Sequence, residues 1–236
     1  MNNLLVKLLG HDILWCERPE EADDELRGRT RFLDKLWLPC DLALLTKDQI
    51  LVINRYREGV IATEGQYQFA RSARRTMHRV ASALRSKKVV EIGCGKYPVE
   101  VSSLEYLGVD IDDEAITFIR SLGLSGCHPD EIRANLTGQV DLIVSVYAMH
   151  FSVSEDFLAN LASLSTPDAI ICFNLIVEDA VNPISLLARL APDWPFAQVV
   201  KTDRMARREY FFIAGRPYSH SKINDAVRAV REALLD

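Results

Sequence analysis

The most informative segment of this 236-residue chain is KVVEIGCGKYP, residues 88–98, an apolar run that ends in two closely spaced glycines. The run predicts a short strand that is buried on both faces. Gly93 and Gly95 predict a turn in which the backbone approaches a ligand with no Cβ in the way. A second apolar strand, over 107–111, carries Asp110 near its end. Because ligands bind at the carboxyl ends of strands in open α/β sheets, we expect a nucleoside site here, with the Asp110 carboxylate accepting both ribose hydroxyls.

The residues around the two glycines exclude two common kinds of phosphate site. A dinucleotide-binding turn has a third glycine, which would fall at Pro98, and proline has no N–H to offer a pyrophosphate. A P-loop needs Ser or Thr after its Gly-Lys pair, whereas Tyr97 follows Lys96 here. Glu91, just before the turn, also disfavours a phosphate and suits a cationic ligand that bears an amino group.

Strand-like and helix-like segments alternate from this turn to the end of the chain. Apolar runs predict strands, and one-sided apolar periodicity predicts helices. The remaining strands are expected over 140–147 and 169–177, the helices over 66–85, 114–122, 157–164, 184–190 and 223–234, and an antiparallel pair over 197–201 and 209–214. The alternation predicts a doubly wound α/β domain with an antiparallel edge.

The first sixty residues do not follow this rhythm. A weak helical pattern covers Pro19–Trp37, and the apolar runs 41–45 and 50–56 flank Thr46-Lys-Asp-Gln49 as in a β-hairpin with a four-residue loop. We therefore expect residues 1–60 to form a small α+β appendage that acts as a cap or a dimerisation surface. Residues 61–236 are expected to form the cofactor-binding domain.

Four segments of the second domain resemble motifs of one enzyme family, in the family's order. They are Glu91-x-Gly93-Cys94-Gly95, Gly108-Val-Asp110-Ile-Asp112, Val140-Asp-Leu-Ile-Val-Ser145 and Phe211-Phe-Ile-Ala-Gly215. Together they resemble the class I S-adenosylmethionine-dependent methyltransferases over about residues 85–217. The resemblance implies a seven-stranded, mostly parallel, Rossmann-like sheet with an antiparallel final strand. It also implies S-adenosylmethionine as the cofactor.

The resemblance also assigns residues to the cofactor site, with some departures from the family pattern. Tyr97 replaces the third glycine of the first motif, and the polar residue that usually follows the third strand is either Asp130 or Asn135. Cys94 is expected to be a small buried residue beside the cofactor rather than a nucleophile. The predicted cofactor-binding residues are Glu91, Gly93, Cys94, Gly95, Asp110, Ile111 and Asn135.

Two residues after the fourth predicted strand are candidates for catalysis. His150 lies where the family places residues that face the acceptor, and a neutral imidazole there could act as general base on a hydroxyl. The alternative is a histidine that only caps or packs. Tyr147 is expected either to line the acceptor pocket or to pack.

Composition and charge limit the remaining possibilities. The net charge is −5, yet residues 61–88 carry a net +6, mostly from a stripe of Arg71, Arg74, Arg75 and Arg79. Such a stripe is usually a solvated helix face and could alternatively meet RNA. Five scattered cysteines predict reduced thiols in a cytoplasmic protein and no metal site. No apolar run approaches the ~20 residues of a membrane span.

We therefore expect a transferase that methylates a small-molecule acceptor, for example at a hydroxyl, with no nucleic acid or membrane partner. A homodimer is left open. The alternatives are an RNA methyltransferase that uses the arginine stripe, and a non-catalytic binding module with a methyltransferase-like fold.

Overall fold

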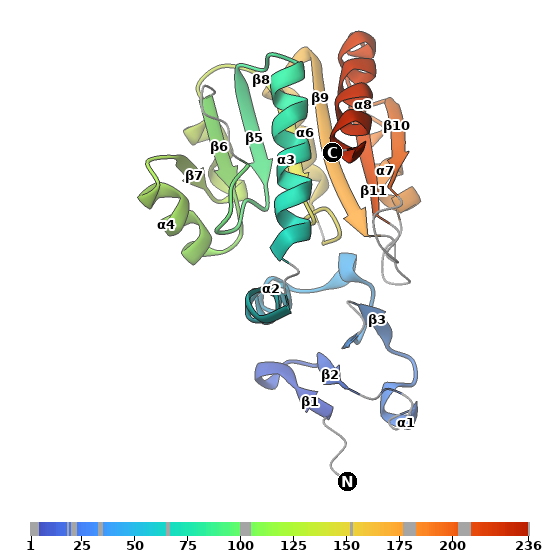
Figure 1. Cartoon of the computed structure of the whole chain (residues 1–236). Coiled ribbons are helices and arrows are strands. Elements are labelled where there is room, and N and C mark those ends of the chain that lie inside the picture. The colour runs from blue at the N-terminus through green and yellow to red at the C-terminus, as the bar shows by residue number, and fades with distance from the viewer. Residues whose placement is uncertain are drawn as a thin grey trace.

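The larger sheet is built from the buried apolar runs of the second domain (Figure 1). The computed structural model describes residues 5–17, 19, 23–32, 35–64, 67–99, 105–151, 153–176, 183–202 and 209–235. Within them the sheet has seven strands in the order β10-β11-β9-β8-β5-β6-β7. These strands are β5 Lys88–Ile92, β6 Glu105–Val109, β7 Ser125–Cys127, β8 Val140–Val146, β9 Ser165–Ile176, β10 Phe196–Lys201 and β11 Glu209–Gly215.

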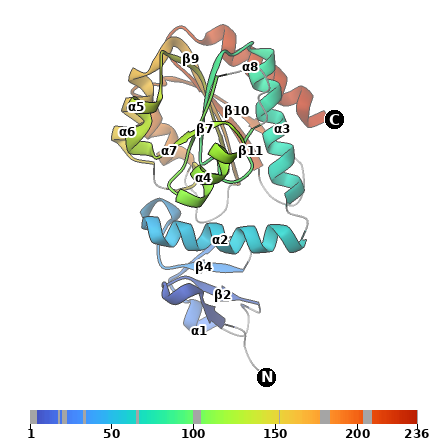
Figure 2. The same ribbon diagram turned by 90° about the vertical axis from the view of Figure 1, so that its left-hand side faces the viewer.

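The pairing of the strands confirms the predicted fold class. Strands β9, β8, β5, β6 and β7 run parallel to one another, whereas β11 runs antiparallel between β9 and β10. The central strands are apolar throughout because both of their faces are covered. Helices α3 (Tyr67–Ala83) and α8 (His220–Leu235) pack on one face, and α6 (Glu155–Ser163) and α7 (Pro183–Leu190) pack on the other (Figure 2).

Short helices follow strands β6 and β7, which extend the sheet beyond β5. Helix α4 (Asp113–Ser121) follows β6, and the carboxylate of Asp112 caps it by accepting from the N–H of Glu114 at 3.0 Å. A 3₁₀ turn η4 (Pro129–Glu131) and helix α5 (Ile132–Asn135) follow β7. The stretch in which a short crossover helix would follow the glycine turn, residues 100–104, lies outside the described residues.

The N-terminal region is an α+β unit, but its elements differ from those predicted. It holds a four-stranded antiparallel sheet in the order β1-β2-β4-β3, a short helix α1 and a long helix α2. Their bounds are β1 Leu5–Lys7, η1 Leu8–Gly10, β2 Leu14–Cys16, α1 Asp23–Leu26, β3 Thr30–Phe32, β4 Leu36–Leu38, η3 Leu42–Leu44 and α2 Lys47–Glu64. The predicted helix over Pro19–Trp37 is therefore wrong, because α1 is its only α-helical part among the described residues.

The predicted hairpin around residues 46–49 is also wrong, because those residues start helix α2. The N–H of Gln49 donates to Thr46 Oγ1 at 3.3 Å, and the N–H of Thr46 donates to Gln49 Oε1 at 2.9 Å. This reciprocal pair is a capping box, which satisfies N–H groups at the start of a helix. Ile50 and Ile53 are then buried together on one helical face. The expected domain boundary at 60/61 falls inside this helix.

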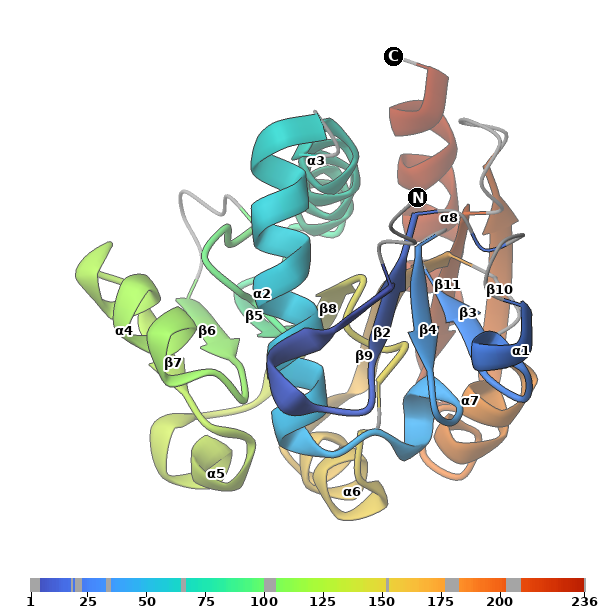
Figure 3. The same cartoon turned by 90° about the horizontal axis from the view of Figure 1, so that it is seen from below.

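The N-terminal unit lies over the carboxyl ends of the large sheet (Figure 3). Its apolar core contains Phe32, Leu36 and Ile53 together with Phe151, which follows β8. Ile111, which follows β6, packs against the same core. The N-terminal unit therefore covers the carboxyl ends of the strands, where ligands bind in open α/β sheets. None of the helices in the described ranges is both long and apolar enough to cross a membrane.

Candidate functional site

The glycine turn after β5 depends on its two glycines for different reasons. Gly93 has a φ of +67°, and a Cβ on it would lie 2.1 Å from the Cβ of Ala148 in the turn after β8. Gly95 has a φ of +55°, but a Cβ there would meet nothing within 4 Å. Gly93 therefore permits close packing of two turns. Gly95 leaves one side of the backbone open, as the predicted turn requires.

Asp110 joins this turn to the end of β6. Its Oδ2 accepts from the N–H of Gly95 at 2.9 Å, and its Oδ1 accepts from the N–H of Asp112 at 3.0 Å. The side chain is only 8% exposed. Burial raises the pKa of the carboxyl, and the two backbone N–H groups partly oppose that rise. Each carboxylate oxygen has a second lone pair, so Asp110 can still accept hydrogen bonds from a ligand.

Glu91 lies deeper than the sequence predicted. It is 0% exposed, and its Oε2 accepts from the hydroxyl of Tyr106 at 2.6 Å and from the N–H of Val99 at 2.8 Å. Its Oε1 is buried without a hydrogen-bond partner among the described residues. Burial raises the pKa of this carboxyl to about 7, against the lowering effects of Arg74, Tyr106 and Val99. Glu91 therefore holds the chain that leaves the glycine turn, rather than presenting a carboxylate to a ligand.

Among the described residues, Arg74 supplies the positive charge that acts on Glu91. It belongs to the predicted arginine stripe of α3, yet it is half-buried, and its Nε is buried without a hydrogen-bond partner in the described structure. The electrostatic interaction of Arg74 lowers the pKa of Glu91. Arg71, Arg75 and Arg79 are exposed. The exposed stripe therefore contains Arg71, Arg75 and Arg79 but not Arg74.

The other predicted cofactor residues divide between the turn and more distant positions. Cys94 is fully buried beside Tyr106, and burial raises the pKa of its thiol, as expected for a packing residue. Ile111 is half-buried against the N-terminal core. Asn135 is exposed at the end of α5, where its Nδ2 donates to the carbonyl of Glu131 at 3.0 Å. The structure does not bring Asn135 together with the turn residues.

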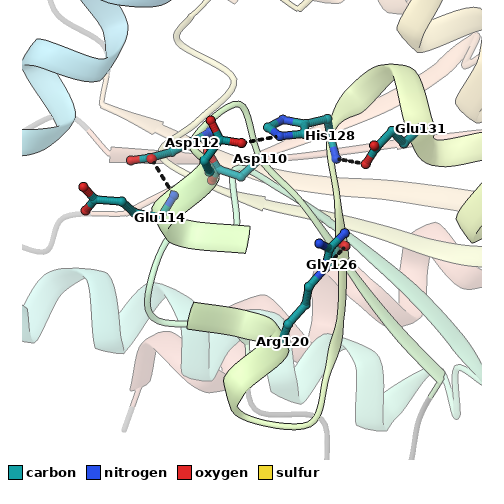
Figure 4. Close-up of polar contacts among 8 residues, drawn as sticks. Asp110, Asp112, Glu114, Arg120, Gly126, His128 and Glu131 are labelled. Carbon is teal, nitrogen blue, oxygen red and sulfur yellow. Dashed lines mark hydrogen bonds and ion pairs between the residues drawn. The ribbon is translucent and has the colours of Figure 1, made fainter. Parts of the chain in front are cut away.

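Instead, the residue directly after β7 is His128, which the sequence reasoning did not select (Figure 4). Its Nε2 lies 2.8 Å from the Oδ1 of Asp113, at the start of α4. Its backbone N–H donates to Glu131 Oε2 at 3.2 Å. His128 and the acidic start of α4 thus form the border of the site beside Asp110. A strand of only three residues, Ser-Gly-Cys, gave no periodic signal that could have located this position.

His150 makes contacts that argue against the predicted general-base role. Its Nε2 accepts from the backbone N–H of Ile176 at 2.9 Å, so the ring proton of the neutral form is assigned to Nδ1, which lies 3.1 Å from the carbonyl of Tyr147. The side chain is 6% exposed. Both ring nitrogens are therefore engaged by the backbone. These bonds join the turn after β8 to the end of β9, which is the capping alternative considered for this residue.

Tyr147 adopts an unusual backbone conformation for a residue with a side chain. Its φ is +55°, a strained region that in other proteins concentrates at functional sites. Its N–H donates to Asn174 Oδ1 at 3.0 Å, and its hydroxyl donates to Glu209 Oε1 at 2.6 Å. Asn174 Nδ2 donates to the same oxygen at 2.8 Å. The ends of β8 and β9 and the start of β11 thus meet in one polar network, of which the sequence reasoning selected only Tyr147.

No protein-family model and no curated protein matches the sequence. Solved structures do match the fold. One is the plantazolicin methyltransferase BpumL in complex with SAH, at a TM-score of 0.50 and 10% identity, over 69% of this chain and 90% of that chain. Another is the N-methyltransferase NodS from Bradyrhizobium japonicum WM9, at a TM-score of 0.51 and 12% identity, over 65% of this chain and 98% of that chain. The large sheet and its helices therefore have the class I methyltransferase fold.

Proposed function

We propose that this protein transfers a methyl group from S-adenosylmethionine to a small-molecule acceptor. The observation that carries the proposal is the joint between the glycine turn and Asp110 at the carboxyl ends of β5 and β6. The open side of Gly95 and the spare lone pairs of Asp110 suit a nucleoside with two hydroxyls to donate. BpumL, which has the same fold, was solved with SAH, the demethylated product of this donor.

The chain's own residues would hold and orient the donor rather than react with it. Asp110 would accept from the ribose hydroxyls, and the backbone around Gly95 would line the adjoining side. The sulfonium of the donor supplies an electrophilic methyl carbon. The protein's share of the rate is then mainly positioning, which can contribute about 7–11 kcal/mol. The N-terminal core around Phe151 would exclude water from this edge of the sheet.

The geometry removes the support for a hydroxyl acceptor and weakens the RNA alternative. A hydroxyl acceptor was expected because His150 could serve as its base, and that support is lost because the backbone engages both ring nitrogens. The RNA alternative is weakened because Arg74 is half-buried and interacts electrostatically with Glu91, so it is not part of the exposed stripe. We therefore propose a small molecule, rather than RNA, as the acceptor.

Calorimetric titration of the full chain tests the proposal. We expect S-adenosylmethionine and its demethylated product to bind, and Asp110→Ala to weaken both by roughly 1–3 kcal/mol, because backbone N–H groups and ligand hydroxyls lose their acceptor. Asp156→Ala, at an exposed carboxylate on α6, is the matched control. Binding of NADH without binding of either sulfur compound would refute the assignment, as would an Asp110→Ala variant with unchanged affinity.

A further inference from the structure

Glu209, at the start of β11, is a carboxylate whose hydrogen-bond donors among the described residues are all neutral. Its Oε1 accepts from the Tyr147 hydroxyl and from Asn174 Nδ2, at 2.6 and 2.8 Å. Its Oε2 accepts from Thr202 Oγ1 at 3.3 Å. Within the described part of the chain, it forms no ion pair with Lys, Arg or His. A half-buried carboxylate is usually stabilised by a cation, and hydrogen bonds to charged donors are about twice as strong as those to neutral ones.

The two oxygens of Glu209 are not equivalent. Oε1 receives two short bonds from Tyr147 and Asn174, which are both buried. Oε2 receives a single long bond from a hydroxyl. A carboxylate offers about four lone-pair positions, so the capacity that remains lies mainly at Oε2. The network thus fixes the carboxylate in place through one oxygen and leaves the other able to accept from a stronger donor.

Tyr147 connects this carboxylate to the proposed donor site, because its hydroxyl donates to Glu209 and its chain neighbour packs against the glycine turn. Tyr147 directly precedes Ala148, and Ala148 is the residue that a Cβ on Gly93 would strike. The turn after β8 therefore packs against the glycine turn through Ala148 and contributes Tyr147 to the Glu209 network. Tyr147 has a positive φ at this turn. The hydrogen bond from its N–H to Asn174 Oδ1 stabilises that backbone conformation.

We propose that Glu209, held by Tyr147 and Asn174, is the subsite that recognises the acceptor, and that the acceptor carries a primary or secondary amine. The inference rests on the proposed function, because the subsite is placed by its link through Tyr147 to the turn that packs against Gly93. The carboxylate offers acceptor positions only, so its ligand must donate hydrogen. A protonated amine supplies both the hydrogen and the counter-charge that the described residues do not give Glu209. A neutral hydroxyl would supply the hydrogen alone.

Carboxyl-carbon NMR of protein labelled with ¹³C only in glutamate tests the subsite without knowledge of the natural acceptor. The probe is methylammonium chloride, and sodium chloride at equal ionic strength is the control. We expect one resonance to shift saturably with methylammonium, at a Kd of about 10 mM or weaker for so small a ligand. That resonance should be absent from both Glu209→Gln and Glu209→Asp, of which the second keeps a carboxylate if the first does not fold.

A companion variant separates recognition from a structural role. Tyr147→Phe removes one neutral donor and keeps the carboxylate, so methylammonium should still shift the Glu209 resonance, with affinity equal or higher. Equal shifts with both salts, or no shift at all, would overturn the inference. Calorimetry with S-adenosylhomocysteine is run on the same samples. If that compound binds and methylammonium does not, the subsite fails and the proposed function stands. The reverse result removes the proposed function and leaves an amine-binding carboxylate.

Discussion

Replacing Glu91 by Gln should change the pH dependence of stability more than stability itself. The wild-type carboxyl is 0% exposed, and its pKa is raised from 4.5 to about 7, mainly by burial. Between those two values the folded state binds more protons than the unfolded state, so stability falls as pH rises. From about pH 5 to about pH 9, the wild type should lose about 2–3 kcal/mol that the glutamine variant does not lose. The variant has no proton to release, because an amide does not titrate.

The assay is urea unfolding followed by tryptophan fluorescence, with both proteins measured at each pH. The informative quantity is the difference in free energy of unfolding between the two proteins, because other titrating groups cancel in it. Glu232→Gln, at an exposed carboxylate on α8, controls for the change in net charge. If the difference stays constant to within about 0.5 kcal/mol over this pH range, Glu91 is already ionised near its ordinary pKa, and the account of its burial is wrong.

Three further predictions follow from single contacts. Gly93→Ala should destabilise the fold by about 2–4 kcal/mol, because its Cβ meets Ala148 at 2.1 Å in a left-handed backbone. Gly95→Ala should cost only about 1–2 kcal/mol of backbone strain, and thermal melts of the pair would show the contrast or contradict it. His150→Phe should cost about 1–3 kcal/mol through lost backbone partners, and any pH step in the methylation rate should survive it; disappearance of that step would restore the general base. Thr46→Val should lower the free energy of unfolding by about 1 kcal/mol, and no change in urea melts would show that the capping box is dispensable.

The part of the fold that follows from the sequence is the part with continuous apolar runs or long helical periodicity. Strands β8 and β9 are such runs, and α3 and α8 repeat apolar residues at helical spacing, so their places in the sheet could be predicted. Strand β7 and the four N-terminal strands have three residues each, too few to show a period. Helix α2 does not follow from the sequence pattern, because four consecutive apolar residues, Ile50 to Ile53, look like a strand and the capping box before them resembles a turn.

The same division applies to the candidate site. Gly95 and Asp110 could be placed together because each ends one of two adjacent parallel strands, and the structure joins them by a hydrogen bond. Asn174 and Glu209 could not be placed beside Tyr147, because that meeting depends on the register of β11 against β9. His150 was correctly placed in the turn after β8. Its hydrogen bond with Ile176 depends on the residue at which β9 ends, which no local sequence pattern specifies.

Because they share the core around Phe151, the N-terminal unit and the methyltransferase-like domain should unfold cooperatively. Phe151 belongs to the chain of the large domain but is buried among Phe32, Leu36 and Ile53 of the smaller one. Neither unit can open without exposing the apolar surface of the other, so the free energies of their unfolding are coupled. Amide hydrogen exchange would then show similar protection in β4 and in the strands that end beneath it. A cap fastened in this way belongs to the folding unit itself.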